Sequence, residues 1–235
     1  ALFEGRLRKE KSRTMFTDTQ LERYADVLMW ALGAARKSRF KKGDLILVRF
    51  HAAALALAER LFSRVIEAGM HPVPRLLSTP RMESAFYKKA DARQLVFHPP
   101  GTKELFESLN GSIYLYAPEA LTHLGDVDPL RIAKSARAYQ PFKEILDTRD
   151  KAGAFGWTLC LVPTAEPARH AGIDTAAYTR QIVKACFLDR KDPVAMWREV
   201  HREVQEVKKW LTGLAPERLH IASANVDLVI RVGEK

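Results

Sequence analysis

The first clear pattern of apolar and polar positions begins at Thr17. Apolar side chains then recur every three or four residues, as on one face of a helix, at Leu21, Tyr24, Ala25, Leu28 and Leu32. Thr17 and Gln20 have the spacing of a capping box, in which two side chains bond backbone N–H groups at the start of a helix. The pattern predicts a helix that begins near Thr17. Residues 1–16 have no periodicity that would join a core, so we interpret them as an N-terminal extension.

Short apolar runs and helical segments alternate over the next part of the chain. The apolar runs predict strands at 43–50, 71–78, 94–99, 112–118 and 156–163, and the segments between them predict helices at 53–69, 101–110 and 129–149. A strand, a crossover helix and a second strand form a unit whose two strands are parallel. The sequence therefore predicts an α/β fold with a largely parallel sheet sandwiched by helices.

The sequence predicts further details of the helix at 129–149 and the strand at 156–163. Asp128 and Pro129 are suitable residues to begin the long helix, and Pro141 inside it should kink or break it. The run at 156–163 is almost continuously apolar, which is typical of a strand that is covered on both faces.

The pattern changes towards the end of the sequence. Two helices follow one another at 175–187 and 192–213, and residues 218–232 alternate around Ala224 and Asn225 like two short antiparallel strands. The fold should therefore end in a helical pair and a short β-hairpin. We assign residues 17–235 to this α/β domain.

Composition narrows the class of protein. The 235-residue chain is 47% hydrophobic, which is enough for a substantial core. Its longest apolar run, at 52–58, is far shorter than the roughly 20 residues that span a bilayer, and no secretory signal is recognisable. We expect a cytoplasmic protein with no membrane partner.

Cys160 and Cys186 both lie among hydrophobic residues, which predicts buried free thiols.

The net charge of +10 is concentrated in two places. Residues 1–15 carry a surplus of +3 and residues 36–42 carry +5, which leaves the rest of the chain close to neutral. No basic stripe with interleaved aromatic residues is present, as a binder of single-stranded nucleic acid would need. We interpret residues 36–42 as a solvated basic loop and do not expect nucleic acid as a partner.

The last predicted helix contains metal-ligand residue types within two turns: Glu199, His201, Glu203 and Glu206. A zinc-binding helix presents two histidines four residues apart, and a di-iron helix presents Glu-x-x-His; neither spacing occurs here. We interpret the segment as an ordinary amphipathic helix with the apolar stripe Met196, Val200, Val204, Val207 and Leu211.

Other candidate chemistry is weaker still. No glycine-rich phosphate loop and no nucleophile elbow occur. His51, His71 and His98 lie at predicted strand ends, where α/β folds gather binding groups, but single histidines are more typical of a surface or of a satisfied internal site. The sequence therefore assigns no catalytic, cofactor-binding or metal-binding residue to this chain. A small-ligand or nucleotide site at the carboxyl edge of the sheet remains open, without a motif to support it.

Several segments together resemble one known family, the aminopeptidase T and aminopeptidase S family of dinuclear metalloaminopeptidases. The resemblance runs from about residue 19 to residue 232. It is strongest in DVDPLRIAKSARAYQPFKE at 126–144, GWTLCLVPTAEPARHAG at 156–172 and DPVAMWREVHREVQEVKKWL at 192–211. Asn225 and Val226 stand where the family favours Gly-Thr, which is a minor departure in the turn.

The resemblance implies a two-domain hydrolase, often a homodimer, that removes N-terminal residues from peptides with two divalent metals, zinc or cobalt. In that family the metal ligands lie in a C-terminal catalytic domain, so we expect residues 17–235 to be the N-terminal domain, which packs on the catalytic domain and shapes substrate access. We expect this chain alone to hold no metal and to be inactive. The alternative is a stand-alone binding or scaffold protein that retains the fold without peptidase chemistry.

Overall fold

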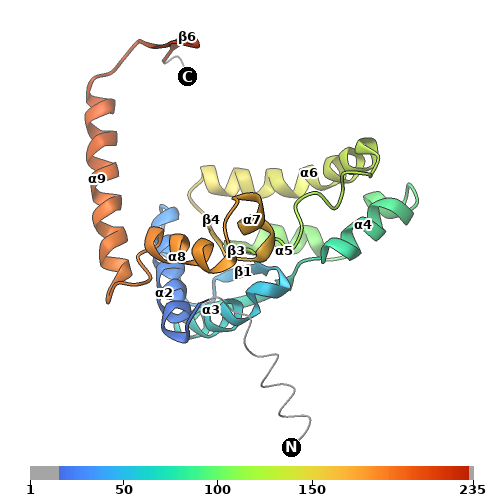
Figure 1. The fold of residues 1–235 in the computed structure, drawn as a ribbon. Coiled ribbons are helices and arrows are strands. Elements are labelled where there is room, and N and C mark those ends of the chain that lie inside the picture. The colour runs from blue at the N-terminus through green and yellow to red at the C-terminus, as the bar shows by residue number, and fades with distance from the viewer. Residues whose placement is uncertain (1–15, 233–235) are drawn as a thin grey trace, which may run out of the picture. The chain divides into compact units, whose positions relative to one another are not determined.

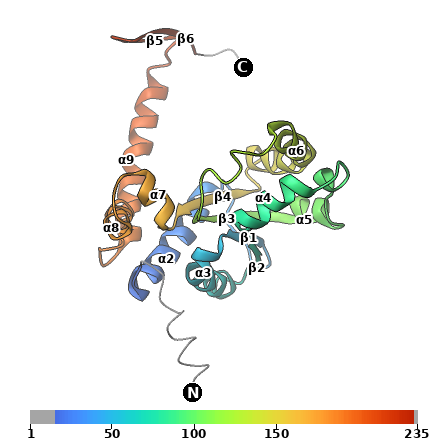
Figure 2. The same cartoon turned by 45° about the vertical axis from the view of Figure 1, so that its right-hand side comes forward.

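The computed structural model describes residues 16–232, which form two compact units, residues 16–193 and residues 194–232. The first unit (Figure 1) contains a four-stranded parallel sheet with the strand order β2-β1-β3-β4, and all four strands are labelled in Figure 2. The elements of this unit, in chain order, are α2 (Asp18–Ala35), β1 (Leu45–Phe50), η1 (Ala52–Ala54), α3 (Leu55–Glu67), β2 (His71–Leu76), α4 (Pro80–Lys89), η2 (Gln94–Val96), α5 (Thr102–Ser108), β3 (Leu109–Tyr116), α6 (Pro129–Lys151), β4 (Gly156–Leu161), α7 (Ala165–His170) and α8 (Thr175–Ala185). The predicted α/β class with a parallel sheet is confirmed.

The helix α2 begins with the predicted capping box. The Gln20 backbone N–H donates to Thr17 Oγ1 at 3.2 Å, and the Thr17 N–H donates to Gln20 Oε1 at 2.9 Å. Phe16, which the sequence placed in the extension, is buried and packs edge-on against Tyr24 with ring centroids 5.6 Å apart. The core therefore includes at least one residue before Thr17, and residues 1–15 lie outside the described part of the chain.

The two faces of the sheet are covered unequally. Helices α2 and α3 lie against one face, and α5 and α6 lie on the other (Figures 1 and 2). On the α2 and α3 face, alternate strand residues such as Ile46, Val48 and Ile113 are at most 1% exposed and belong to the main hydrophobic core. On the α6 face the buried core is small, with Leu47, Leu109 and Phe155 at its centre. One face is therefore sealed and the other is only partly filled.

The predicted strand at 94–99 is wrong, because this segment contains the 3-10 turn η2. The Asp91 carboxylate accepts the backbone N–H groups of Arg93 and Gln94 at 2.7 and 2.8 Å, which favours a turn. Pro99 and Pro100 follow and have no N–H to donate to a strand ladder.

The long helix α6 continues through Pro141, so the expected break does not occur. Proline removes one intrahelical hydrogen bond, and packing on both sides of Pro141 supports the helix. Tyr139 and Phe142 each pack against Phe106 of α5, with ring centroids 5.7 Å apart. The helix begins as predicted, because Asp128 Oδ1 accepts the Leu130 N–H at 2.9 Å.

The strand β4 is not covered on both faces, as its apolar sequence suggested. Trp157 and Leu159 are 52% and 54% exposed, whereas Cys160 on the opposite face is buried. The strand lies at the edge of the sheet and pairs only with β3, and α6 does not extend fully over its outer face.

Two short helices were not predicted, α4 and α7. The signal for α4 was present, because Thr79 Oγ1 accepts the Met82 N–H at 3.3 Å and Pro80 occupies the first turn. The predicted helix at 175–187 is confirmed as α8.

The second unit contains α9 (Pro193–Gly213, whose first residue belongs to the first unit), β5 (Arg218–Ser223) and β6 (Val226–Arg231). The hairpin is antiparallel, with Ser223 opposite Val226 across the predicted turn at Ala224 and Asn225. Its cross-strand pairs place five apolar side chains on one face: Leu219, Ile221, Val226, Leu228 and Ile230. Each of these is 40–48% exposed. No helix within residues 16–232 is long and apolar enough to cross a membrane.

Candidate functional site

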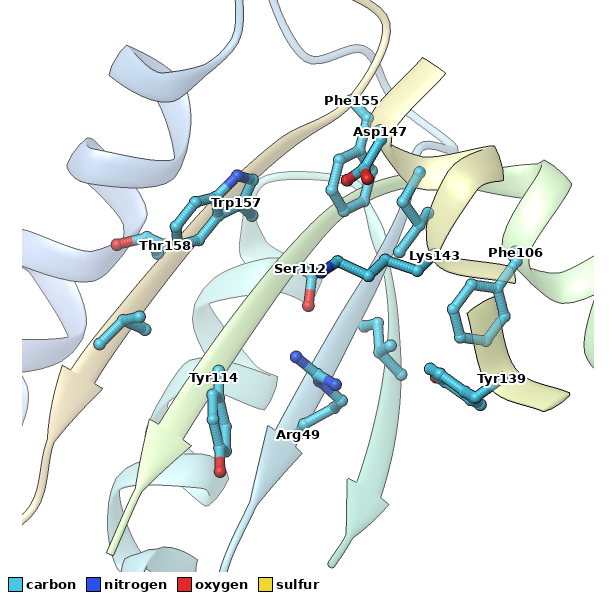
Figure 3. Close-up of a pocket in the computed structure, with 13 residues that line it drawn as sticks. Arg49, Phe106, Ser112, Tyr114, Tyr139, Lys143, Asp147, Phe155, Trp157 and Thr158 are labelled. Carbon is cyan, nitrogen blue, oxygen red and sulfur yellow. The ribbon is translucent and has the colours of Figure 1, made fainter. Parts of the chain in front are cut away.

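A pocket lies over the less covered face of the sheet, between strands β1, β3 and β4 and helix α6 (Figure 3). Its volume is about 380 Å³, at the small end of the range of ligand pockets. The lining residues are Leu47, Arg49, Phe106, Ser112, Tyr114, Tyr139, Lys143, Leu146, Asp147, Phe155, Trp157, Thr158 and Leu159.

The strand register explains most of the pocket floor. Alternate residues of a strand point to the same face, so Leu47 and Arg49 share a face of β1. Two rows of neighbours run across the three parallel strands, namely Leu47–Ser112–Trp157 and Arg49–Tyr114–Leu159. Residues more than a hundred positions apart in the chain therefore form one surface.

Charged side chains enter this pocket from the sheet and from α6. The guanidinium of Arg49 lies over the Tyr114 ring, 4.9 Å from its centroid, and Nε of Arg49 is buried without a hydrogen-bond partner. Lys143 and Asp147 come from successive turns of α6. Among residues 16–232, these three charged side chains make no ion pair within 4.0 Å with one another or with any other residue.

Aromatic rings form the wall opposite β4. Phe106 and Tyr139 line the pocket and contact each other. Both also contact Phe142, which is not a lining residue, and His98 packs edge-on against Phe142 with a centroid distance of 4.6 Å. Burial raises the pKa of the Tyr139 phenol, and the positive charge of Arg49 opposes that shift. Tyr139 is therefore a neutral hydroxyl beside the pocket at physiological pH.

The structure does not bring the three strand-end histidines together. His51 follows β1 at the carboxyl edge of the sheet, where its Nδ1 accepts the Ala117 N–H at 3.2 Å. His71 is exposed and begins β2, at the opposite edge. His98 follows η2, and its Nε2 lies 3.0 Å from the Ala138 carbonyl oxygen. Two of these histidines thus have local partners, and they do not form a common site.

The carboxylates of α9 are exposed on one helix. Arg202 forms ion pairs with Glu199 and, at 3.9 Å, with Glu206, while Glu203 and His201 are also exposed. These are contacts between residues three or four apart on a helix surface. The described part of the chain contains no group of three or more His, Cys, Asp or Glu side chains that could hold a metal ion.

The two cysteines lie in the main core beside Tyr24. Tyr24 donates to the Leu161 carbonyl oxygen at 3.2 Å, and Cys186 Sγ lies 3.6 Å from the Tyr24 hydroxyl. Cys160 is buried and Cys186 is partly buried, and both are free thiols. Burial raises the pKa of each thiol, so both are poor nucleophiles.

The basic loop at 36–42 is not uniformly solvated. Arg36 forms an ion pair with Asp44 at 2.7 Å, and the two side chains are 7% and 13% exposed. The guanidinium also lies 4.6 Å from the Phe40 ring centroid, and a Cβ on Gly156 would approach Arg36 Cβ to 2.8 Å. Arg36 therefore anchors this loop to the start of β4, whereas Lys37 and Arg39 are exposed.

Comparisons with known proteins identify a similar solved structure and a matching family. A fold similar to this one occurs in a solved structure described as wild-type AmpT from Thermus thermophilus, with a TM-score of 0.68 and 19% sequence identity. The similarity covers 92% of this chain and 54% of that chain, so this chain spans about half the length of AmpT. No curated protein matches the sequence. Residues 17–235 match the family described as thermophilic metalloprotease (M29), which confirms the resemblance seen in the sequence. The chain belongs to the M29 family of metalloproteases.

Proposed function

We propose that this chain is the non-catalytic N-terminal domain of a metal-dependent aminopeptidase, a hydrolase that removes N-terminal residues from peptides. The observation that carries the proposal is the extent of the match: nearly all of this chain corresponds to about half of AmpT. The M29 family is metal-dependent. The side chains of residues 16–232 do not fit a metal centre, because no three candidate ligands lie together. In this proposal, the two divalent metals, zinc or cobalt, and the peptide substrate are bound by a catalytic domain.

The second unit supports a role in packing against that domain. A two-stranded hairpin is marginally stable on its own, and this one carries an apolar face. In α9, Val204, Val207 and Leu211 of the predicted stripe are 55%, 55% and 46% exposed. Apolar surface of this extent is typical of an interface. We propose that α9 and the hairpin contribute to the contact with the catalytic domain, and that this contact helps to shape access of peptides.

Hydrolysis of a leucyl anilide tests the proposal. The 235-residue chain, supplied with zinc or cobalt, should release no anilide above the rate of a metal-only control. A longer protein from the same reading frame, with a catalytic domain after Lys235, should release it. Metal-dependent cleavage by the 235-residue chain would refute the proposal. A reading frame that ends at Lys235 would favour the stand-alone scaffold.

A further inference from the structure

The pocket over β1, β3 and β4 contains the guanidinium of Arg49, which has no ion-pair partner in the part of the chain that the structure describes. Arg49 is partly buried, its Nε is buried without a hydrogen-bond partner, and its guanidinium lies over the Tyr114 ring. Taking a charged group out of water is unfavourable unless an opposite charge or hydrogen bonds compensate for it. This site therefore favours an anionic ligand.

A second cation enters the same pocket from the other side. Figure 3 shows the side chains of Arg49 and Lys143 extending into the pocket towards Ser112. Like charges that approach one another repel, and the repulsion is relieved when an anion lies between them. Arginine and lysine on facing elements, with a serine hydroxyl beside them, can together hold one carboxylate.

The negative charge of Asp147 favours a ligand that also has a positively charged group. Asp147 lines the same pocket one turn after Lys143 and has no ion-pair partner among the described residues. A phosphate dianion would be repelled by this carboxylate, whereas a ligand with both a carboxylate and an amine would satisfy all three charges. The remaining lining is mainly apolar, with Phe106, Phe155 and Trp157 as ring walls.

We propose that this pocket binds a free α-amino acid with an apolar side chain. Its carboxylate lies between Arg49 and Lys143, its ammonium faces Asp147, and its side chain packs on the aromatic walls. The volume of about 380 Å³ suits a ligand smaller than most drug-sized molecules. The pocket is formed by residues 47–159 alone, so this assignment does not depend on the peptidase proposal.

Isothermal titration calorimetry of the 235-residue chain tests the assignment with L-leucine and 4-methylpentanoate. These two ligands share a carboxylate and an isobutyl group and differ in the amine. Leucine should bind with the higher affinity, and the Asp147→Asn variant should remove that advantage. Inorganic phosphate should give no heat of binding at the same concentrations.

Two variants on different elements test the anion contact. Arg49→Met and Lys143→Met each remove one cation and should weaken leucine binding by about tenfold or more, since hydrogen bonds to charged groups contribute that much. Lys134→Met is the matched control, because Lys134 is exposed on the same helix as Lys143 and lies outside the pocket. It should bind leucine like the parent protein. Thermal unfolding of each variant establishes that it is folded.

Four results would overturn the assignment. The first two are that the folded parent protein does not bind leucine, or that Arg49→Met and Lys143→Met both bind leucine as tightly as the parent does. The other two are that 4-methylpentanoate binds with the same affinity as leucine, or that phosphate binds more tightly than leucine. None of these results bears on whether a catalytic domain supplies peptidase activity, which the anilide assay measures separately.

Discussion

Replacement of Arg36 by methionine should destabilise the first unit strongly, although Arg36 belongs to a basic loop that looks solvated in the sequence. Methionine retains much of the aliphatic length of arginine, so the packing of Arg36 against Gly156 changes little. The charge of Asp44 then loses its ion-pair partner while its side chain is only 13% exposed.

The size of the effect follows from the burial of the pair. Removing one partner of a buried ion pair destabilises a protein by about 3–5 kcal/mol. Asp44 Oδ2 still accepts the Lys41 N–H at 3.0 Å, so we expect the lower end, about 3 kcal/mol. For a chain of this size, 1 kcal/mol corresponds to a shift of about 2–4 °C in Tm, and the variant should therefore unfold about 6–12 °C earlier.

Thermal unfolding followed by circular dichroism measures this shift, with Arg39→Met as the matched control. Arg39 carries the same charge three residues away but is exposed, and its replacement should change the free energy of unfolding by less than about 0.5 kcal/mol. Replacing both members, as in Arg36→Met with Asp44→Leu, should recover much of the lost stability, because no uncompensated charge remains. Equal Tm values for Arg36→Met and Arg39→Met would refute the anchoring role of Arg36.

Three further outcomes are expected. Cys160 and Cys186 should react with a disulfide reagent only after unfolding, because both thiols are buried or partly buried; rapid labelling of the folded chain would contradict this. Burial raises the pKa of Cys160 and of Tyr24 in the folded state, so their stabilising contribution is present below the unfolded values of about 8.5 and 10 and is lost as pH rises above them. The free energy of unfolding, measured with urea at a series of alkaline pH values, should fall as pH rises, and it should fall less steeply in Cys160→Ala. The same dependence on pH in parent and variant would argue against a contribution from Cys160. Leu228→Glu should lower the binding of a hydrophobic dye by the apolar hairpin face, and unchanged dye fluorescence would contradict that.

Local sequence signals predicted the elements that local interactions stabilise. The capping box at Thr17 and Gln20 fixed the start of α2, and the alternation around Ala224 and Asn225 fixed the turn of the hairpin. The same kind of reasoning was wrong for 94–99, because an apolar run resembles a strand unless the turn-forming contribution of Asp91 is recognised.

Features that depend on tertiary packing were not accessible from the sequence. The apolar run of β4 did not indicate which face α6 would leave open, so the exposure of Trp157 and Leu159 was unexpected. The pocket was missed for a related reason. Arg49, Ser112 and Lys143 belong to three separate elements, and only the register of the parallel strands and the position of α6 bring them together. No local spacing signals such a group.

The most direct test of the central claim is the metal content of the purified 235-residue chain. The protein is incubated with zinc or cobalt and desalted exhaustively, and the bound metal is measured per mole of protein by elemental mass spectrometry. Our account places the metal centre in a catalytic domain outside this chain and predicts essentially no retained metal. Retention of about two equivalents, the content of a two-metal site, would contradict it and would mean that the chain itself builds such a centre.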